Sequence, residues 1–175
     1  MSGQVRMALF KKLMLIVCLQ NPFEHRVRHN WEARDKVMTL NREASDIVKW
    51  IGNGSNSQSV GHGLGATPSL VIIKASSTTS DWVVRTTVID GSLDYLVLNT
   101  TAAAANSSDS APTSTVINIS NTAGVNTNGV TYIAYCFAPI SGYSAIGKYN
   151  GNGSSDGPFV YTGFRPAYVL IKKIG

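Results

Sequence analysis

Carboxylates are the residues of this sequence best suited to hydrolytic chemistry, and they are few. A glycosidase needs two carboxyl groups that face each other across the scissile bond. From Ile47 onward the chain has no glutamate, and its aspartates are Asp81, Asp90, Asp94, Asp109 and Asp156. These aspartates form no close pair in the sequence, and only the fold could bring two of them together. We therefore predict no catalytic residues and no enzymatic activity.

A single histidine, His62, accompanies these aspartates and lies between Gly61 and Gly63. Such a histidine can orient a nucleophile, for example a nearby serine. The interpretation that we favour is a turn histidine hydrogen-bonded to the backbone. Neither this turn nor the pair Gly52 and Gly54 precedes an expected helix, so a phosphate-binding loop has no physical basis.

Oxygen-bearing side chains alternate in one loop, in a pattern weakly similar to a calcium loop: Asn150, Asn152, Ser154 and Asp156. A hard dication needs more negative charge than the one carboxylate here supplies. The similar turn within residues 49–55 has no carboxylate at all. We favour an ordinary polar turn, and we predict no metal site and no cofactor.

Aromatic residues are the remaining candidates for ligand binding. Sugars stack on exposed aromatic rings beside hydroxyl and amide groups. The rings considered are Trp50, Trp82, Tyr143, Tyr149 and Tyr161. The favoured alternative for Trp82 and Tyr149 is packing in the core. The loop 100–114 is rich in small residues and is expected at the surface, where functional contacts tend to lie. The binding residues stay unknown at this stage.

The composition of the 175 residues indicates a folded protein, with 43% hydrophobic and 14% charged residues. Residues 1–50 hold nine Lys/Arg and five Asp/Glu, and residues 51–175 hold six and five. The formal net charge of +5 therefore lies mostly in the leading segment, which argues against a nucleic-acid groove on the folded body. Cys18 and Cys136 form neither a disulfide framework nor a zinc spacing, and Cys136 is expected to be a buried free thiol.

Residues 1–45 are expected to form a basic, helical N-terminal extension. Residues 13–19 are apolar and follow Lys11 and Lys12, as in a signal-peptide core, and they are too few to cross a bilayer. No small-residue cleavage site follows, and Cys18 ends an imperfect lipobox, so a short buried or partner-binding helix is the alternative. Residues 24–44 lack Gly and Pro, which predicts a further helix.

From Ile47 onward, short β-branched and aromatic runs alternate with Gly, Asn, Ser and Thr clusters. This pattern predicts an all-β fold, an antiparallel β-sandwich of the jelly-roll-like kind. Thr115–Ser120 alternates as a strand with one dry face does. Tyr132–Phe137 is apolar on both faces, which predicts a central strand covered by a second layer or by another subunit. The expected strands are Ile47–Ile51, Ser69–Lys74, Trp82–Val88, Leu93–Asn99, Thr115–Ile119, Thr131–Ala138, Ala145–Tyr149, Phe159–Thr162 and Ala167–Ile174.

An internal repeat relates two parts of the chain. Lys49–Ser55 matches Lys148–Ser154 with five identities in seven positions, at an offset of 99 residues. Pro68–Lys74 matches Pro166–Lys172 at an offset of 98 residues. Each copy predicts a strand, a Gly-Asn-Gly turn, a second strand, a bend containing Gly and Pro, and a buried strand.

The repeat suggests a division of the chain. We expect the N-terminal extension over 1–45 and a β-sandwich domain over 46–147. Residues 148–175 are either the start of a second repeat copy or the closing strands of the same sandwich. We favour a second copy, because it has nothing that corresponds to Trp82–Phe137.

The most distinctive motifs are Gly61–Pro68 leading into Val71–Lys74, then Leu98–Ala103, Tyr132–Phe137 and Gly142–Ser144. Together they resemble a domain of unknown function that recurs, often in tandem, in virion and tail-fibre-like proteins of tailed bacteriophages, especially marine ones. The resemblance covers about residues 46–175, and Gly151–Lys173 looks like the start of the next tandem copy.

The resemblance implies a structural protein of a phage virion, from a tail fibre or a related appendage, with a role in assembly and host adhesion. The expected partners are other virion proteins, further copies of the chain (a homotrimer included) and host surface glycans. We expect no nucleic-acid partner, no membrane span and no active site. The alternative is a secreted carbohydrate-binding or carbohydrate-active protein.

Overall fold

Antiparallel pairing connects the strands of the computed structural model, which describes residues 4–6, 13–20, 44–121 and 124–175. For residues 4–6 and 13–20 the description covers the backbone. The strands are β1 (Gln4–Arg6), β2 (Leu13–Gln20), β3 (Ser45–Ile51), β4 (Gln58–Gly61), β5 (Leu70–Ala75), β6 (Val83–Thr86), β7 (Asp94–Val97), β8 (Ala105–Asn106), β9 (Val116–Ile119), β10 (Thr131–Phe137), β11 (Ser144–Asn150), β12 (Phe159–Tyr161) and β13 (Pro166–Lys173). The predicted all-β fold is confirmed, and each strand expected after Ile47 overlaps one of these elements.

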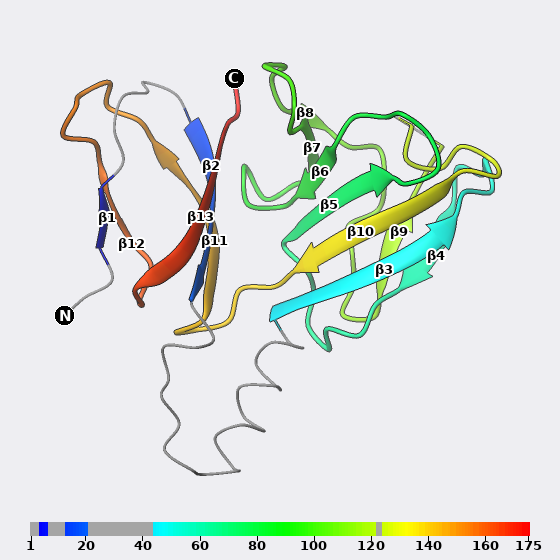
Figure 1. Cartoon of the computed structure of the whole chain (residues 1–175), viewed down its shortest axis with the longest axis horizontal. Helices are drawn as coiled ribbons and strands as arrows, with labels where there is room; N and C mark the ends of the chain where they lie inside the picture. The colour runs from blue at the N-terminus through cyan, green and yellow to red at the C-terminus, as the bar shows by residue number, and fades with distance from the viewer. Residues whose placement is uncertain (1–3, 7–12, 21–43, 122–123) are drawn as a thin grey trace, which may run out of the picture.

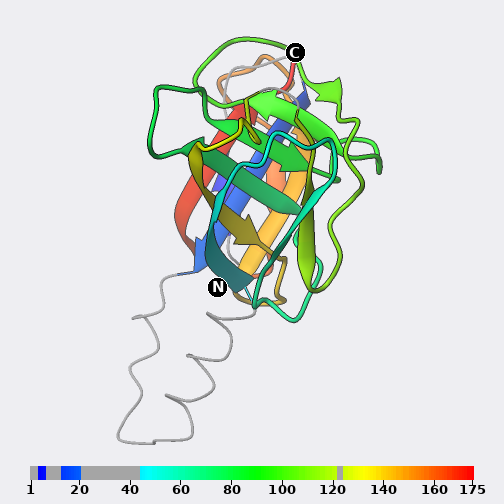
Figure 2. The same ribbon diagram turned by 90° about the vertical axis from the view of Figure 1, so that its right-hand side faces the viewer.

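The described strands form layers (Figure 1). A six-stranded sheet, β3-β10-β5-β6-β7-β8, faces a three-stranded sheet, β11-β2-β13. The pair β4–β9 covers the other face of the six-stranded sheet, and β12, paired with β1, covers the other face of the three-stranded sheet. In Figure 2 the blue, orange and red strands of the three-stranded sheet run across the green strands of the larger sheet. The predicted antiparallel β-sandwich is therefore present, with outer strand pairs added to it.

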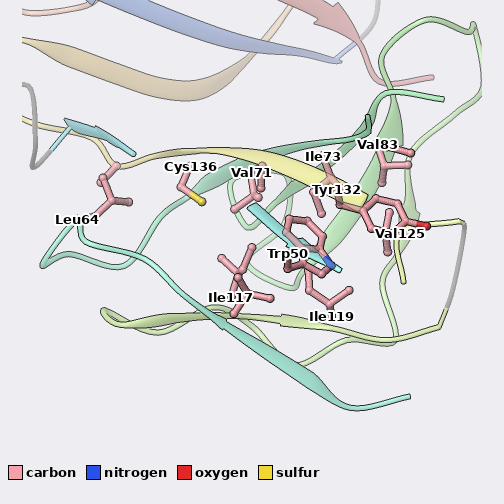
Figure 3. Close-up of a cluster of buried hydrophobic side chains, with 14 residues drawn as sticks. Trp50, Leu64, Val71, Ile73, Val83, Ile117, Ile119, Val125, Tyr132 and Cys136 are labelled. Atoms are coloured by element: carbon pink, nitrogen blue, oxygen red, sulfur yellow. The ribbon is translucent and has the colours of Figure 1, made fainter. Parts of the chain in front are cut away.

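The larger core lies between the six-stranded sheet and β4–β9 (Figure 3). Tyr132 and Cys136 point into it from β10, and Ile117 and Ile119 point toward them from β9. The alternation predicted for the β9 region is thereby confirmed. Cys136 is a buried free cysteine, as expected. Burial raises the pKa of its thiol to about 12, with the charge of Asp46 as the second cause, so Cys136 stays protonated.

The second core lies between the opposite face of the six-stranded sheet and β11-β2-β13. Leu70 and Ile72 of β5, together with Leu96 of β7, pack in one cluster with Ile146 and Leu170. Strands β5 and β10 therefore send side chains into a core on each face, as their two-sided apolar patterns predicted. The covering layer comes from the same chain.

Two lysine side chains attach the three-stranded sheet to the rest of the molecule. The Nζ of Lys148 on β11 donates a hydrogen bond to the carbonyl oxygen of Ile89, and the Nζ of Lys172 on β13 donates to that of Thr100. The backbone N–H of Ala104 donates to the carbonyl oxygen of Ile174 at 2.7 Å. These polar contacts border the second core on the β11-β2-β13 side.

The sequence repeat corresponds to a structural repeat, because the first copy forms β3, β4 and β5 and the second forms β11, β12 and β13. Asn53 and Asn152 each accept a hydrogen bond from the backbone N–H two residues later, at 2.9 and 3.0 Å. Gly54 and Gly153 follow them with φ of 70° and 72°, a region that glycine adopts without strain. The division of the chain at 46–147 and 148–175 stays a prediction.

The described part of the N-terminal extension is β structure. Strand β1 pairs with β12, and β2 lies between β11 and β13. The helix expected as the alternative for the apolar run 13–19 is therefore wrong. An unbroken apolar run suits a central strand, because both faces of such a strand are covered. The helix predicted over 24–44 lies almost wholly outside the described residues.

Candidate functional site

A tryptophan that precedes β6, Trp82, is 37% exposed. The Nζ of Lys74 lies 5.8 Å from the centre of its indole ring, which is a cation–π distance. This ammonium group also donates hydrogen bonds to the carbonyl oxygen of Ser80 at 2.5 Å and to its hydroxyl at 3.2 Å. The contacts restrain the lysine and the ring, while part of the ring stays open to solvent.

Polar contacts hold the backbone at Trp82. The backbone N–H of Trp82 donates to Oδ1 of Asn99 at 3.0 Å, and Nδ2 of Asn99 donates to Oδ1 of Asp81 at 2.9 Å. The carbonyl oxygen of Trp82 accepts from the N–H of Leu98 at 2.8 Å. The segment after β7 therefore holds the start of β6 in place. We call this cluster the Trp82 surface, and its members are Lys74, Ser80, Asp81, Trp82 and Asn99.

The Trp82 surface has the groups that bind a sugar. An indole ring can cover the C–H face of a pyranose, and the carboxylate and amide at its rim can hydrogen-bond to hydroxyl groups. Asp81, Trp82 and Asn99 are all exposed, so a ligand can approach them without rearrangement of the core. Hydrolysis of a glycoside at this cluster would require a second carboxyl group facing Asp81.

Asp90 and Asp94 interact electrostatically, but only Asp90 is accessible. Oδ1 of Asp90 accepts from the hydroxyl and the N–H of Ser92 at 2.7 and 2.8 Å, and these bonds lower the pKa of the Asp90 carboxyl. Asp94 is 3% exposed. Burial raises the pKa of Asp94, and the charge of Asp90 adds to this effect. A carboxyl group this deeply buried on β7 is out of reach of a sugar.

Asp109 belongs to a buried ion pair that the sequence analysis missed. Its carboxylate contacts the guanidinium of Arg85, and both side chains are almost fully buried. Oδ1 of Asp109 accepts from the N–H of Ser120 at 3.0 Å, and Nη1 of Arg85 donates to the hydroxyl of Ser107 at 3.3 Å. Burial lowers the pKa of Arg85 to about 10, which leaves it charged at neutral pH. The signal in the sequence is an arginine within the apolar β6 run, which requires a partner once buried.

A small cavity borders this ion pair. Its lining includes Arg85, Ser110, Pro112 and Ile117. The volume of this cavity that the centre of a water molecule can occupy is about 10 Å³, which is roughly enough for one water molecule. A sugar ring does not fit this volume, so the ion pair serves the structure by fixing the otherwise largely exposed loop 100–114 against β6.

His62 is a turn histidine, as favoured from the sequence. Its Nε2 lies 3.1 Å from the carbonyl oxygen of Thr113, and its Nδ1 accepts from the N–H of Leu64 at 3.4 Å. These partners assign the ring proton to Nε2, because only a protonated nitrogen can donate to a carbonyl oxygen. Both ring nitrogens of His62 are thus hydrogen-bonded to the backbone.

The loop at Asn152 is a polar turn, as predicted. Oδ1 of Asn152 accepts from the N–H of Ser154 at 3.0 Å, and the N–H of Asp156 donates to the hydroxyl of Ser154 at 3.2 Å. Asn53 and Ser55 make the same two kinds of contact in the first copy. Among the described residues, no three His, Cys, Asp or Glu side chains come together in a way that could hold a metal ion.

Trp50, another candidate ring, is part of the larger core. It is 7% exposed and stacks on Tyr132, with ring centroids 5.3 Å apart and an interplanar angle of 19° (Figure 3). Stacked aromatic pairs of this kind stabilise a core beyond the area they bury. Trp50 therefore supports the fold and is closed to a ligand.

The other candidate rings, which are Tyr143, Tyr149, Tyr161 and Trp82, divide into packed and exposed ones. Tyr149 packs against the cluster of Phe164, and burial raises the pKa of both Tyr149 and Tyr143. Tyr161, on β12, is 71% exposed. Core packing is thus right for Tyr149 and wrong for Trp82, because Trp82 lies in the exposed segment just before β6.

The fold and the Trp82 surface define an antiparallel β-sandwich protein with an exposed aromatic site. The chain belongs to a family of domains of unknown function, DUF7483, whose profile matches residues 34–175. No curated protein and no solved structure matches the chain. Across the described ranges, no helix has the length and apolar character needed to cross a membrane.

Proposed function

We propose that this chain is a non-enzymatic structural and adhesion module of a phage virion, associated with a tail fibre or a similar appendage. Its adhesive site is the Trp82 surface, and its ligands are glycans of the host surface. The observation that carries the proposal is the exposed indole of Trp82, which lies against the ammonium group of Lys74, while Asn99 holds the backbone N–H of the same residue. Burial of a tryptophan stabilises a fold, so an exposed and restrained tryptophan favours a ligand-binding role.

The composition supports this role. Only 14% of the residues are charged, and the polar surface is made largely of hydroxyl and amide groups, which suit contact with neutral sugars. The motifs between Gly61 and Ser144 support the virion assignment, since they resemble tandem domains of tail-fibre-like proteins. Asp94 and Asp109, two of the five aspartates considered for hydrolysis, are buried.

The alternative is a secreted carbohydrate-binding protein, which would use the same Trp82 surface. The two functions differ in their ligands. A virion adhesin binds polysaccharides of a bacterial surface, whereas a secreted binder of nutrient or matrix sugars has other targets. A glycan array probed with the full chain separates them by the class of glycan retained.

The mutational test compares Trp82→Ala with Tyr161→Ala, an exposed aromatic residue on the far strand β12. Loss of ring stacking should weaken glycan binding by about tenfold, the equivalent of about 1.4 kcal/mol. Tyr161→Ala should bind as the parent chain does. Circular dichroism and thermal melting of both variants check that the fold is kept.

Three results would count against the proposal. The adhesive role fails if the parent chain binds no glycan on the array. The placement of the site fails if Trp82→Ala binds as well as Tyr161→Ala. Release of shorter sugars from a bound glycan, detected by mass spectrometry, would overturn the assignment as a non-enzymatic protein.

A further inference from the structure

We call strands β3, β4, β5, β9 and β10 the first unit, and strands β1, β2, β11, β12 and β13 the second unit. Strand β2 takes the same place in the second unit that β10 takes in the first. In the six-stranded sheet, β10 lies between β3 and β5, the first and third strands of the first repeat copy. In the three-stranded sheet, β2 lies between β11 and β13, the first and third strands of the second copy (Figure 1). Both inserted strands are antiparallel to their neighbours.

The equivalence holds residue by residue along the first strand of each copy. Tyr132 of β10 pairs with Trp50 of β3. Met14 of β2 pairs with Tyr149 of β11, the residue that the repeat matches to Trp50. The same alignment sets Cys18, opposite Ala145, in the place of Cys136.

The third strand of each copy gives the same register independently. Ile133, the residue after Tyr132, pairs with Lys74 of β5. Leu15, the residue after Met14, pairs with Lys172 of β13, the repeat equivalent of Lys74. Both edges of β2 therefore agree on the alignment with β10, which a chance insertion would not produce.

The outer strand pairs follow the same plan. In the first unit β4 pairs with β9, with Val60 opposite Ile117. In the second unit β12 pairs with β1, with Val160 opposite Val5. Strands β1 and β2 thus supply counterparts of β9 and β10 to a unit whose other strands come from residues 144–173.

We propose that β11, β12 and β13 form a strand-acceptor site, and that residues 4–20 of a second copy of this chain can occupy it in place of the chain's own segment. Among the described strands, β2 is hydrogen-bonded to β11 and β13. Residues 21–43 make the covalent connection from β2 to the body of the first unit. A segment of identical sequence from a neighbouring molecule makes the same backbone ladder, so exchange costs no interaction at the site.

Strand addition joins two open sheet edges at once, because a missing β2 leaves both β11 and β13 unpaired on one side. Backbone hydrogen bonds supply the affinity, and the two-sided apolar pattern of 13–19 supplies the register. Copies joined in this way form closed dimers or open chains, depending on whether the exchange is reciprocal. The inference rests on strand registers and is independent of the proposed glycan-binding function.

The test uses the full chain with Ala145→Cys, which places a thiol opposite Cys18 in the β2–β11 ladder. Directly opposed residues of an antiparallel pair are close enough for a disulfide. Untagged and size-tagged versions are mixed, unfolded under reducing conditions, refolded together and oxidised with oxidised glutathione. We expect covalent dimers that contain one chain of each size on a non-reducing gel, in a proportion that rises with protein concentration.

Two variants serve as controls. Ile146→Cys places the thiol opposite Val17, one residue out of register with Cys18, so it should give no cross-link. Ala145→Cys combined with Cys18→Ser should lose the mixed dimers. Cross-links that stay within one chain at every concentration would overturn exchange between copies. Absence of any Cys18 cross-link, equal cross-linking by Ile146→Cys, or mixed dimers that persist without Cys18 would each overturn the acceptor site.

Discussion

The molecule builds one strand plan twice, from different parts of the chain. The first unit contains β3, β4, β5, β9 and β10, all after residue 44, whereas the second combines β11, β12 and β13 with β1 and β2 from the opposite end of the chain. Because the registers agree, the pairing geometry does not depend on chain continuity. A strand that is apolar on both faces and has the right length is sufficient to complete the unit.

The two units differ in the burial of their described side chains. Among the residues whose side chains the structure describes, the core of the first unit contains Trp50, Tyr132 and many further buried residues, and the cluster between β12 and the three-stranded sheet contains buried Phe164. Strands β6, β7 and β8 extend the first sheet. The second unit instead covers these strands through Ile146 and Leu170.

The largest expected effect on the free energy of unfolding comes from a comparison of Trp50 with its repeat equivalent, Tyr149. Trp50→Ala should lower the free energy of unfolding by about 4 kcal/mol, because it opens a cavity beneath Tyr132. Tyr149→Ala removes the matched ring from a half-buried site and should cost about 2 kcal/mol. Urea unfolding followed by circular dichroism measures both. Equal losses would show that the two units are equally well packed.

An effect of intermediate size is expected at the interface between the two units, where Lys148 can be compared with its repeat equivalent, Lys49. Lys148→Met removes the hydrogen bond to the carbonyl oxygen of Ile89 and should cost about 1.5 kcal/mol, a typical value for a bond from a charged donor. Lys49→Met changes the repeat-equivalent residue of the first unit, which is exposed, and should cost less than about 0.5 kcal/mol. A larger loss for Lys49→Met would contradict the assigned role of Lys148 at the interface.

The smallest expected effect concerns Asp94, which lies on the face of β7 that packs toward the second unit. Because its folded-state pKa is raised, ionisation costs stability as the pH rises from the ordinary aspartate range through the folded-state pKa. Asp94→Asn should therefore increase the free energy of unfolding by about 1 kcal/mol at neutral pH. The gain should disappear below the ordinary aspartate pKa. Thermal melts at neutral and acidic pH measure it, and a gain independent of pH would refute the linkage.

Much of the strand layout could be predicted from local patterns. The two-sided runs at Val71–Ile73 and Tyr132–Phe137 indicated covered strands, and both are covered. Strand β4 was harder to find, because Gln58–Gly61 has one β-branched residue, Val60. It becomes a strand because β9 supplies its hydrogen-bond partners, which is information from residues far along the chain.

The sequence could name the candidate aromatic rings but not which of them is exposed. Aromatic residues among hydroxyl and amide groups indicated sugar binding, but the same pattern applied to Trp50 and Trp82. The stacking of Trp50 on Tyr132 and the contact of Trp82 with Lys74 distinguish the two rings. Exposure depends on what covers a side chain, and a neighbouring sequence does not contain that information.

By itself, the sequence determined the all-β fold, the repeat and the turn chemistry around Asn53 and Asn152, because alternation and turn propensity act between neighbouring residues. The tertiary structure alone decided the place of β2, the Arg85–Asp109 pair and the exposure of Trp82. Each of these depends on pairing or packing between distant segments. The hydrophobic effect is non-directional, so it does not by itself decide which strands become neighbours.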